Sequence, residues 1–102
     1  MSNIRSARET LIARILQGDG RSSHADRRAA FGNGDLGEPL STLVRKVAHD
    51  ASAVSDQDVA AVLNAGVEED QVFELLVCAA VGEASRLYDA ARAALDAATS
   101  ES

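Results

Sequence analysis

The stretch "ELLVCAAVG", residues 74–82, is the most apolar part of this chain and holds its only cysteine, Cys78. Residues 72–81 are apolar on nearly every side of a helix, and such a helix is usually covered from more than one direction. At about 100° per residue, one group of apolar residues shares a face opposite Cys78. The group is Phe73, Leu76, Ala80, Ala84, Leu87, Ala91 and Ala94. We therefore expect a long helix running towards Leu95, with another subunit as its second cover.

The composition points to one all-α domain. The chain has 102 residues, too few for two hydrophobic cores. Tryptophan is absent, and Phe31, Phe73 and Tyr88 are the only aromatic residues. Alanine, the best helix former, is abundant, and Pro39 is the single proline.

Two helices are expected before the apolar one. Pro39 suits the first position of a helix whose apolar stripe runs from Leu40 to Val54. Ser55 and Asp58 then form a variant of the capping box that starts the next helix. Gly66 is expected to end that helix.

The N-terminal part predicts a helix over residues 3–17, ended by the sequence Gly18-Asp19-Gly20. Ser22 or Ser23 can cap one or two further turns that reach Phe31. The glycines that follow suggest a linker rather than a phosphate-binding loop, because no strand precedes them and no GK[ST] follows. We therefore divide the chain into an N-terminal helix with a glycine-rich linker, residues 1–37, and a helical domain, residues 38–102.

The net charge of −6 is distributed unevenly. Residues 1–30 carry six arginines against three acids, and residues 31–102 carry four bases against thirteen acids. The basic part is diluted by acids and lacks interleaved aromatics, and the acidic remainder would repel phosphate. We therefore expect no nucleic-acid partner, and we expect residues 1–17 to dock on acidic helices of the same or a neighbouring subunit. Arg8 lies within the apolar stripe of that first helix and needs either an acidic partner or room for its stem to reach water.

The sequence also argues against a membrane protein. The longest apolar run, residues 75–81, is far shorter than the roughly 20 residues of a membrane-spanning helix. Arginines interrupt the N-terminal apolar residues, unlike the apolar core of a signal peptide. A lone cysteine cannot form an internal disulfide framework, so we expect a cytoplasmic protein with no membrane partner.

Residues 53–95, "AVSDQDVAAVLNAGVEEDQVFELLVCAAVGEASRLYDAARAAL", resemble the carboxymuconolactone decarboxylase / alkylhydroperoxidase D-like family. The matching pieces are "VSDQDVAAVLNAG", the turn into "EEDQVFEL" and the small-residue helix "AAVGEASRL" with Arg86; residues 43–52, "LVRKVAHDAS", resemble the preceding helix. The resemblance implies an antiparallel helical bundle over residues 38–102 that assembles as trimers or hexamers. In the redox members, the chemistry lies in a CxxC pair with a following His and a preceding Glu. Cys78 has no second thiol and no His after it, so the chain resembles a degenerate member without that motif.

Individual polar residues give little sign of chemistry. Without a resolving thiol Cys78 cannot run a dithiol cycle, and Glu74 one turn earlier disfavours its thiolate, so we interpret Cys78 as a packing residue. His49 shares a polar face with Arg45 and Lys46, whose charges repel a metal ion. His24, in a polar loop, is expected at the surface.

Charged groups in the apolar helix also have structural explanations. The acids Glu68, Glu69, Asp70 and Glu74 suit the positive start of a helix. They lack the loop spacing of a calcium site. Arg86 has an acid three residues to either side, so a surface ion network is expected.

We therefore expect a non-catalytic, homo-oligomeric accessory or interaction subunit, with no cofactor, metal or catalytic residue. Residues 1–17 are a candidate contact for another protein. The candidate interface residues are Phe73, Leu76, Val77, Cys78, Ala80, Val81 and Arg86.

Two alternatives remain open. One is a decarboxylase-like or peroxidase-like enzyme with an active site at a subunit interface. The other is a regulatory module that binds a small ligand in an apolar pocket lined by Phe73, Leu76 and Tyr88.

Overall fold

The computed structural model describes the backbone of residues 2–100 and the side chains of residues 5–100. This part of the chain is helical, with no strand, so the all-α prediction is confirmed. A single 3-10 turn (Ala51–Ala53) lies between the third and fourth α-helices. The α-helices are α1 (Ser2–Gln17), α2 (His24–Phe31), α3 (Leu40–His49), α4 (Asp56–Asn64) and α5 (Glu69–Ser100).

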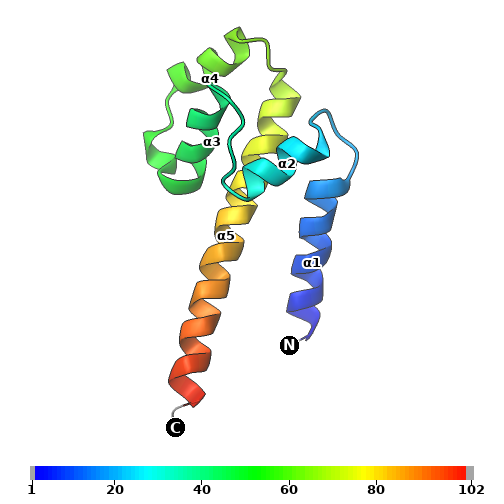
Figure 1. Cartoon of the computed structure of the whole chain (residues 1–102), viewed down its shortest axis with the longest axis vertical. Helices are drawn as coiled ribbons and strands as arrows, with labels where there is room; N and C mark the ends of the chain where they lie inside the picture. The colour runs from blue at the N-terminus through cyan, green and yellow to red at the C-terminus, as the bar shows by residue number, and fades with distance from the viewer. Residues whose placement is uncertain (1, 101–102) are drawn as a thin grey trace.

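Helix α5 runs along the long axis of the molecule (Figure 1). Helix α2 crosses its upper half, α3 and α4 lie to one side, and α1 runs beside it on the other side (Figure 1). The lower half of α5 extends beyond this packed upper part. The molecule is therefore elongated, with principal extents of 55 × 29 × 19 Å.

The core lies on the side of α5 that carries Cys78. Two clusters of buried residues meet there: one joins α5 to α2 and α3, and the other joins α5 to α3 and α4. The buried residues of α5 are Val72, Leu75, Cys78, Ala79 and Gly82. The chain's own helices therefore cover the Cys78 side of α5 and leave the Phe73 side outside the core.

The segment expected to be a linker contributes to this core. Ser23 caps α2 by accepting a hydrogen bond from the amide of Asp26 at 3.0 Å, so the predicted short helix is confirmed. Ala30 of α2 is completely buried against α5. Helix α2, which lies within residues 1–37, therefore packs against α5 of residues 38–102.

The capping box of α4 is confirmed. The amide of Asp58 donates to Ser55 Oγ at 3.3 Å, and Asp58 Oδ2 accepts from the amide of Ser55 at 2.9 Å. Lys46 of α3 donates to the same carboxylate at 3.0 Å. These hydrogen bonds, with that of the Ser55 amide foremost, lower the pKa of Asp58. One carboxylate thus starts α4 and ties it to α3.

The boundaries of α3 differ from those expected. Pro39 is its N-cap rather than its first residue, and α3 ends at His49 instead of continuing to Val54. Glu38 performs the capping instead: its carboxylate accepts from both the amide and the hydroxyl of Thr42, at 2.9 and 2.8 Å. The 3-10 turn then redirects the chain into α4.

Helix α1 docks on its own chain. Arg8 reaches Asp89 of α5 at 2.8 Å and lies 4.9 Å from the centre of the Tyr88 ring, so the acidic partner expected for Arg8 is confirmed. Ile15 and Leu16 pack against the core at the other end of α1. None of the described helices is long and apolar enough to cross a membrane.

Candidate functional site

The second face of α5 is an extended uncovered surface. From Leu87 to Ser100 every residue of this helix is exposed. The exposed fractions of Phe73, Leu87 and Leu95 are 68%, 63% and 61%, unusually high for large apolar residues of one helix. Scattered apolar residues on a surface need no explanation, whereas a continuous patch marks an interaction site.

The patch on α5 is continuous and regular. Starting at Phe73, eight apolar residues follow one another at alternating intervals of four and three residues, which is a seven-residue repeat. They are Phe73, Val77, Ala80, Ala84, Leu87, Ala91, Ala94 and Ala98, which we call the α5 seam. Val77 is half-buried and the other seven are exposed. A sustained 3.5-residue apolar repeat is the pattern by which helices pair in coiled coils.

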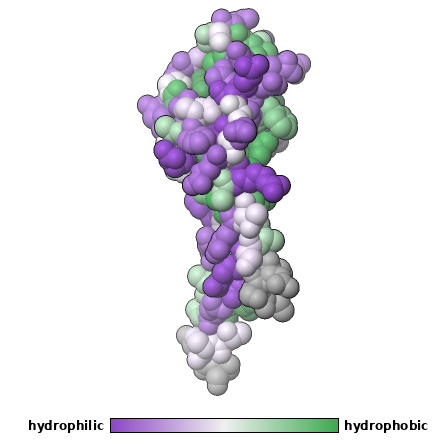
Figure 2. Space-filling view, turned by 90° about the vertical axis from the view of Figure 1, so that its right-hand side faces the viewer, coloured by the Kyte–Doolittle hydropathy of each residue, from purple (hydrophilic) through white to green (hydrophobic). Residues whose placement is uncertain are grey.

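The seam continues onto α1. A groove of about 150 Å³ lies between α1 and α5, and its lining residues are Arg14, Ile15, Asp19, Arg27, Phe73, Glu74, Val77 and Cys78. Arg14 also borders a shallow hollow formed by Ala7 and Leu11 of α1. In the space-filling view, hydrophobic residues reach the surface along the right-hand edge of the upper body, whereas hydrophilic residues cover most of the opposite side (Figure 2).

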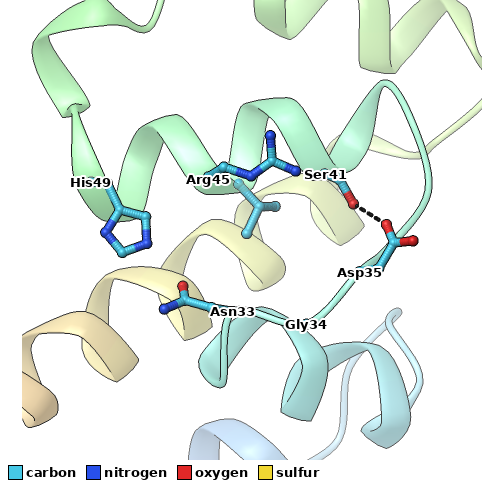
Figure 3. A pocket seen from close by; sticks show the side chains of 7 residues that line it. Asn33, Gly34, Asp35, Ser41, Arg45 and His49 are labelled. Carbon is cyan, nitrogen blue, oxygen red and sulfur yellow. Dashed lines mark hydrogen bonds between the residues drawn. The ribbon is translucent and has the colours of Figure 1, made fainter.

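A second candidate is a polar hollow of about 340 Å³ between α3 and the loop after α2 (Figure 3). Its lining residues are Asn33, Gly34, Asp35, Ser41, Val44, Arg45 and His49. Asp35 Oδ1 accepts from the Gly37 amide at 2.9 Å and from the Ser41 hydroxyl at 2.8 Å, and the first of these bonds contributes most to lowering the Asp35 pKa. Ser41 Oγ in turn accepts from the Leu36 amide at 2.7 Å. The Asp35 carboxylate and the Ser41 hydroxyl therefore hydrogen-bond to each other and to the backbone of the loop.

His49 lies at the far end of that hollow and belongs to a chain of polar contacts. Its Nδ1 is 3.6 Å from Glu83 Oε2, and the same oxygen is 3.1 Å from Arg86 Nη2. Arg86 Nη1 donates to the carbonyl oxygen of Phe31, the last residue of α2, at 2.6 Å. The predicted ion pair of Arg86 with Glu83 is thus confirmed, while Asp89 pairs with Arg8 instead. This chain of contacts joins α3, α5 and α2.

The polar hollow does not bring its serine to its histidine. Ser41 and His49 lie two turns apart on α3, about 12 Å along its axis, whereas a serine and its general base must be within about 3 Å. Among the described residues, no three His, Cys, Asp or Glu side chains gather in a way that could hold a metal ion. His24 is exposed at the start of α2, outside this hollow.

Cys78 lies inside the core, with an exposed fraction of 1%. Its Sγ is 3.6 Å from the carbonyl oxygen of Ile15. Burial raises the pKa of the thiol and outweighs the opposing charge of Arg27, and Glu74 raises the pKa further. Cys78 is therefore a packing residue at a helix contact within the chain, which corrects its placement among the candidate interface residues.

The other candidate interface residues divide into two groups. Phe73 and Ala80 are exposed on the seam, with Val77 half-buried between them, and Leu76 and Val81 are half-buried beside it. Arg86 contacts α2 of its own chain. The apolar ligand pocket expected from Phe73, Leu76 and Tyr88 is not formed, because Phe73 and Tyr88 are fifteen residues apart on one helix, or about 22 Å.

The structural roles of Arg27 and Glu74 were not expected from the sequence. Arg27, 3% exposed, donates through Nε and Nη2 to the Ser22 carbonyl at 3.2 and 2.9 Å, and through Nη1 to the Gly18 carbonyl. Glu74 accepts from the amides of Arg21 and Ser22, at 2.9 and 2.7 Å, so it caps the turn between α1 and α2 rather than merely favouring the start of α5. Burial raises the pKa of Glu74, but these amide hydrogen bonds together lower it.

Comparison with known proteins finds no relative. No protein-family model, no curated protein and no solved structure matches this chain.

Proposed function

We propose that this protein is a non-catalytic helical interaction subunit that self-associates through the exposed face of α5. The observation that carries the proposal is the α5 seam, an unbroken apolar repeat from Phe73 to Ala98 on a helix whose opposite side is packed only between Val72 and Gly82. An apolar face of this length is costly to leave in water and is typical of a protein-binding surface. The resemblance to the alkylhydroperoxidase D-like family adds the expectation of a trimer or a hexamer.

The non-catalytic part of the proposal is supported by the position of Cys78. A reactive cysteine needs access to substrate and a stabilised thiolate, and Cys78 has an enclosed thiol with a raised pKa. The polar hollow beside α3 likewise holds Ser41 in loop hydrogen bonds. Peroxide consumption by the purified protein that disappears in Cys78→Ala would overturn this part of the proposal.

The association is tested by light scattering on the wild type and two charged variants. The wild type should have a mass at least double the 10.6 kDa of one chain at micromolar concentration. Leu87→Glu places a charge in the middle of the seam and should lower that mass. Ala93→Glu adds the same charge at an exposed position outside the seam and should leave the mass unchanged. A monomeric wild type, or a Leu87→Glu variant with the wild-type mass, would contradict the proposal.

A further inference from the structure

The intervals within the α5 seam read the same in both directions. From Phe73 to Ala98 they are 4, 3, 4, 3, 4, 3 and 4 residues. A second α5 running in the opposite direction can therefore place all eight seam residues opposite eight of its own. The centre of this arrangement lies between Ala84 and Leu87.

The side chains that meet in the antiparallel arrangement complement one another in size. Reversing the seam brings each bulky residue against an alanine. The resulting pairs are Phe73 with the partner's Ala98, Val77 with the partner's Ala94, Ala80 with the partner's Ala91, and Ala84 with the partner's Leu87. Alternating large and small residues lets two helices keep an even separation and interdigitate. In a parallel pair, Phe73 and Leu87 would each meet their own copies and hold the alanine layers apart.

The charges beside the seam also favour the antiparallel direction. In a parallel pair, residues five positions apart flank the seam together, so Glu69 would lie beside the position of the partner's Glu74, twice by symmetry. In the antiparallel pair, position 74 lies beside the partner's position 95 and position 83 beside the partner's position 90, so no two acidic residues are neighbours across the seam. The Glu74 and Glu83 carboxylates themselves are hydrogen-bonded within their own chain. Antiparallel helix dipoles also attract each other.

Helix α1 supplies a further complementary contact. Arg14 borders Phe73 and Val77, which in the antiparallel pair lie against the end of the partner's α5. That end has no basic residue in its last turn to offset the negative pole of the helix. Arg14 makes no ion pair with any described residue of its own chain. It is therefore available to the partner's helix end.

The seam supplies part of the surface that a stable pair needs. The seam extends for about 37 Å, and a helix is about 10 Å wide, so α5 alone offers a footprint of roughly 400 Å². The adjoining hollow of Ala7 and Leu11 on α1 widens it, and interdigitation buries more surface than a flat footprint. The α5 footprint is about half of the roughly 800 Å² per partner of a standard specific interface, so contacts from α1 have to supply the rest.

We infer that the occupant of the α5 seam is the α5 seam of a second copy of this chain, packed antiparallel with Ala80 facing the partner's Ala91. This inference rests on the proposed self-association and adds its direction and register. A two-fold contact of this kind cannot lie inside a closed trimer, so the assembly contains an even number of chains.

Disulfide cross-linking in a Cys78→Ala background tests the direction. Ala80→Cys and Ala91→Cys are made as separate proteins and oxidised alone and as a mixture, with exposed Ala93→Cys as the control outside the seam. In the antiparallel pair, Ala80 and the partner's Ala80 are eleven residues apart along the helices, about 16 Å, whereas a disulfide requires Cα atoms within about 7 Å. Covalent dimer should therefore form several-fold more in the mixture than in either protein alone, and Ala93→Cys should give none in either setting.

The same samples are also measured by light scattering before oxidation, which distinguishes the remaining outcomes. Efficient cross-linking of each protein with itself would show a parallel pair and overturn the inference while leaving self-association intact. A dimeric mass with no cross-link through either position would show that the contact lies elsewhere, which also overturns the inference. A monomeric mass would overturn the proposed function together with the inference.

Discussion

The backbone of Gly82 in α5 lies directly against the carbonyl group of Phe31 at the end of α2. A side-chain carbon at position 82 would overlap that carbonyl group. Arg86, one turn further along α5, donates to the same carbonyl oxygen at 2.6 Å. The crossing of α2 over α5 thus depends on the absence of a side chain at Gly82 and on the hydrogen bond from Arg86.

Gly82→Ala should lower the melting temperature. Alanine is favoured over glycine in a helix by about 1 kcal/mol, but overpacking of a tight contact costs about 1–3 kcal/mol. Ala90→Gly, at an exposed position of α5, measures the propensity effect alone. A Gly82→Ala protein that melts higher than the wild type would show that α2 can move aside at little cost.

Arg27→Met should destabilise the fold by several kcal/mol. The substitution leaves the carbonyl oxygens of Gly18 and Ser22 without the buried guanidinium, and each unsatisfied buried group costs about 1–3 kcal/mol. Arg27→Lys should recover only part of the loss, because an ammonium cannot reproduce the planar fork of donors. Chemical denaturation measures both variants. Arg28→Met, at an exposed position of the same helix, should remain close to the wild type.

Glu74→Gln should reduce the dependence of stability on pH. The pKa of Glu74 is lower in the folded chain than in the unfolded chain. The carboxylate therefore contributes stability above its unfolded value of about 4.3, and that contribution is lost as the pH falls through the folded value. The wild type should thus exceed Glu74→Gln in stability at pH 7, with a difference that shrinks below pH 4. A constant difference across this range, measured by denaturation at each pH, would contradict the assignment; exposed Glu69→Gln is the control.

Cys78 should react with thiol reagents only when the structure opens. Its thiol is enclosed and burial raises its pKa, so the nucleophilic thiolate is scarce in the native protein. Labelling with an alkylating reagent should be slow in native buffer and accelerate steeply near the denaturation midpoint. Rapid stoichiometric labelling of the native protein would show that the core around α1 is open.

The sequence predicted the positions of the helices better than it predicted how they pack. The capping box at Ser55 and Asp58 and the glycines after Gln17 act within a few residues, so they could be read directly. The face of α5 that enters the core could not be predicted, because residues 72–81 are apolar on nearly every side. The answer depends on Gly82, whose lack of a side chain matters only when α2 lies across it.

Arg27 and Glu74 also show that contacts between distant parts of the chain could not be predicted from the sequence. Arg27 looked like one of several arginines in a basic N-terminal segment, and nothing in its neighbours distinguishes it from exposed Arg28. Its burial follows from the turn between α1 and α2, which presents two carbonyl oxygens to one guanidinium. Glu74 binds that turn from fifty residues away in sequence, a relationship that spacing along the chain cannot reveal.

The exposed residues 87–100 have a consequence for the kinetics of association. An isolated segment of this length would be a marginal helix, but here the first turns are already fixed by the core, so only propagation through alanine-rich sequence is needed. The binding surface is therefore ordered before it meets a partner, and little chain entropy remains to be lost on contact. Its amide hydrogens should nevertheless exchange with solvent faster than those of residues 72–82 in the free chain, and they should slow once a partner covers them.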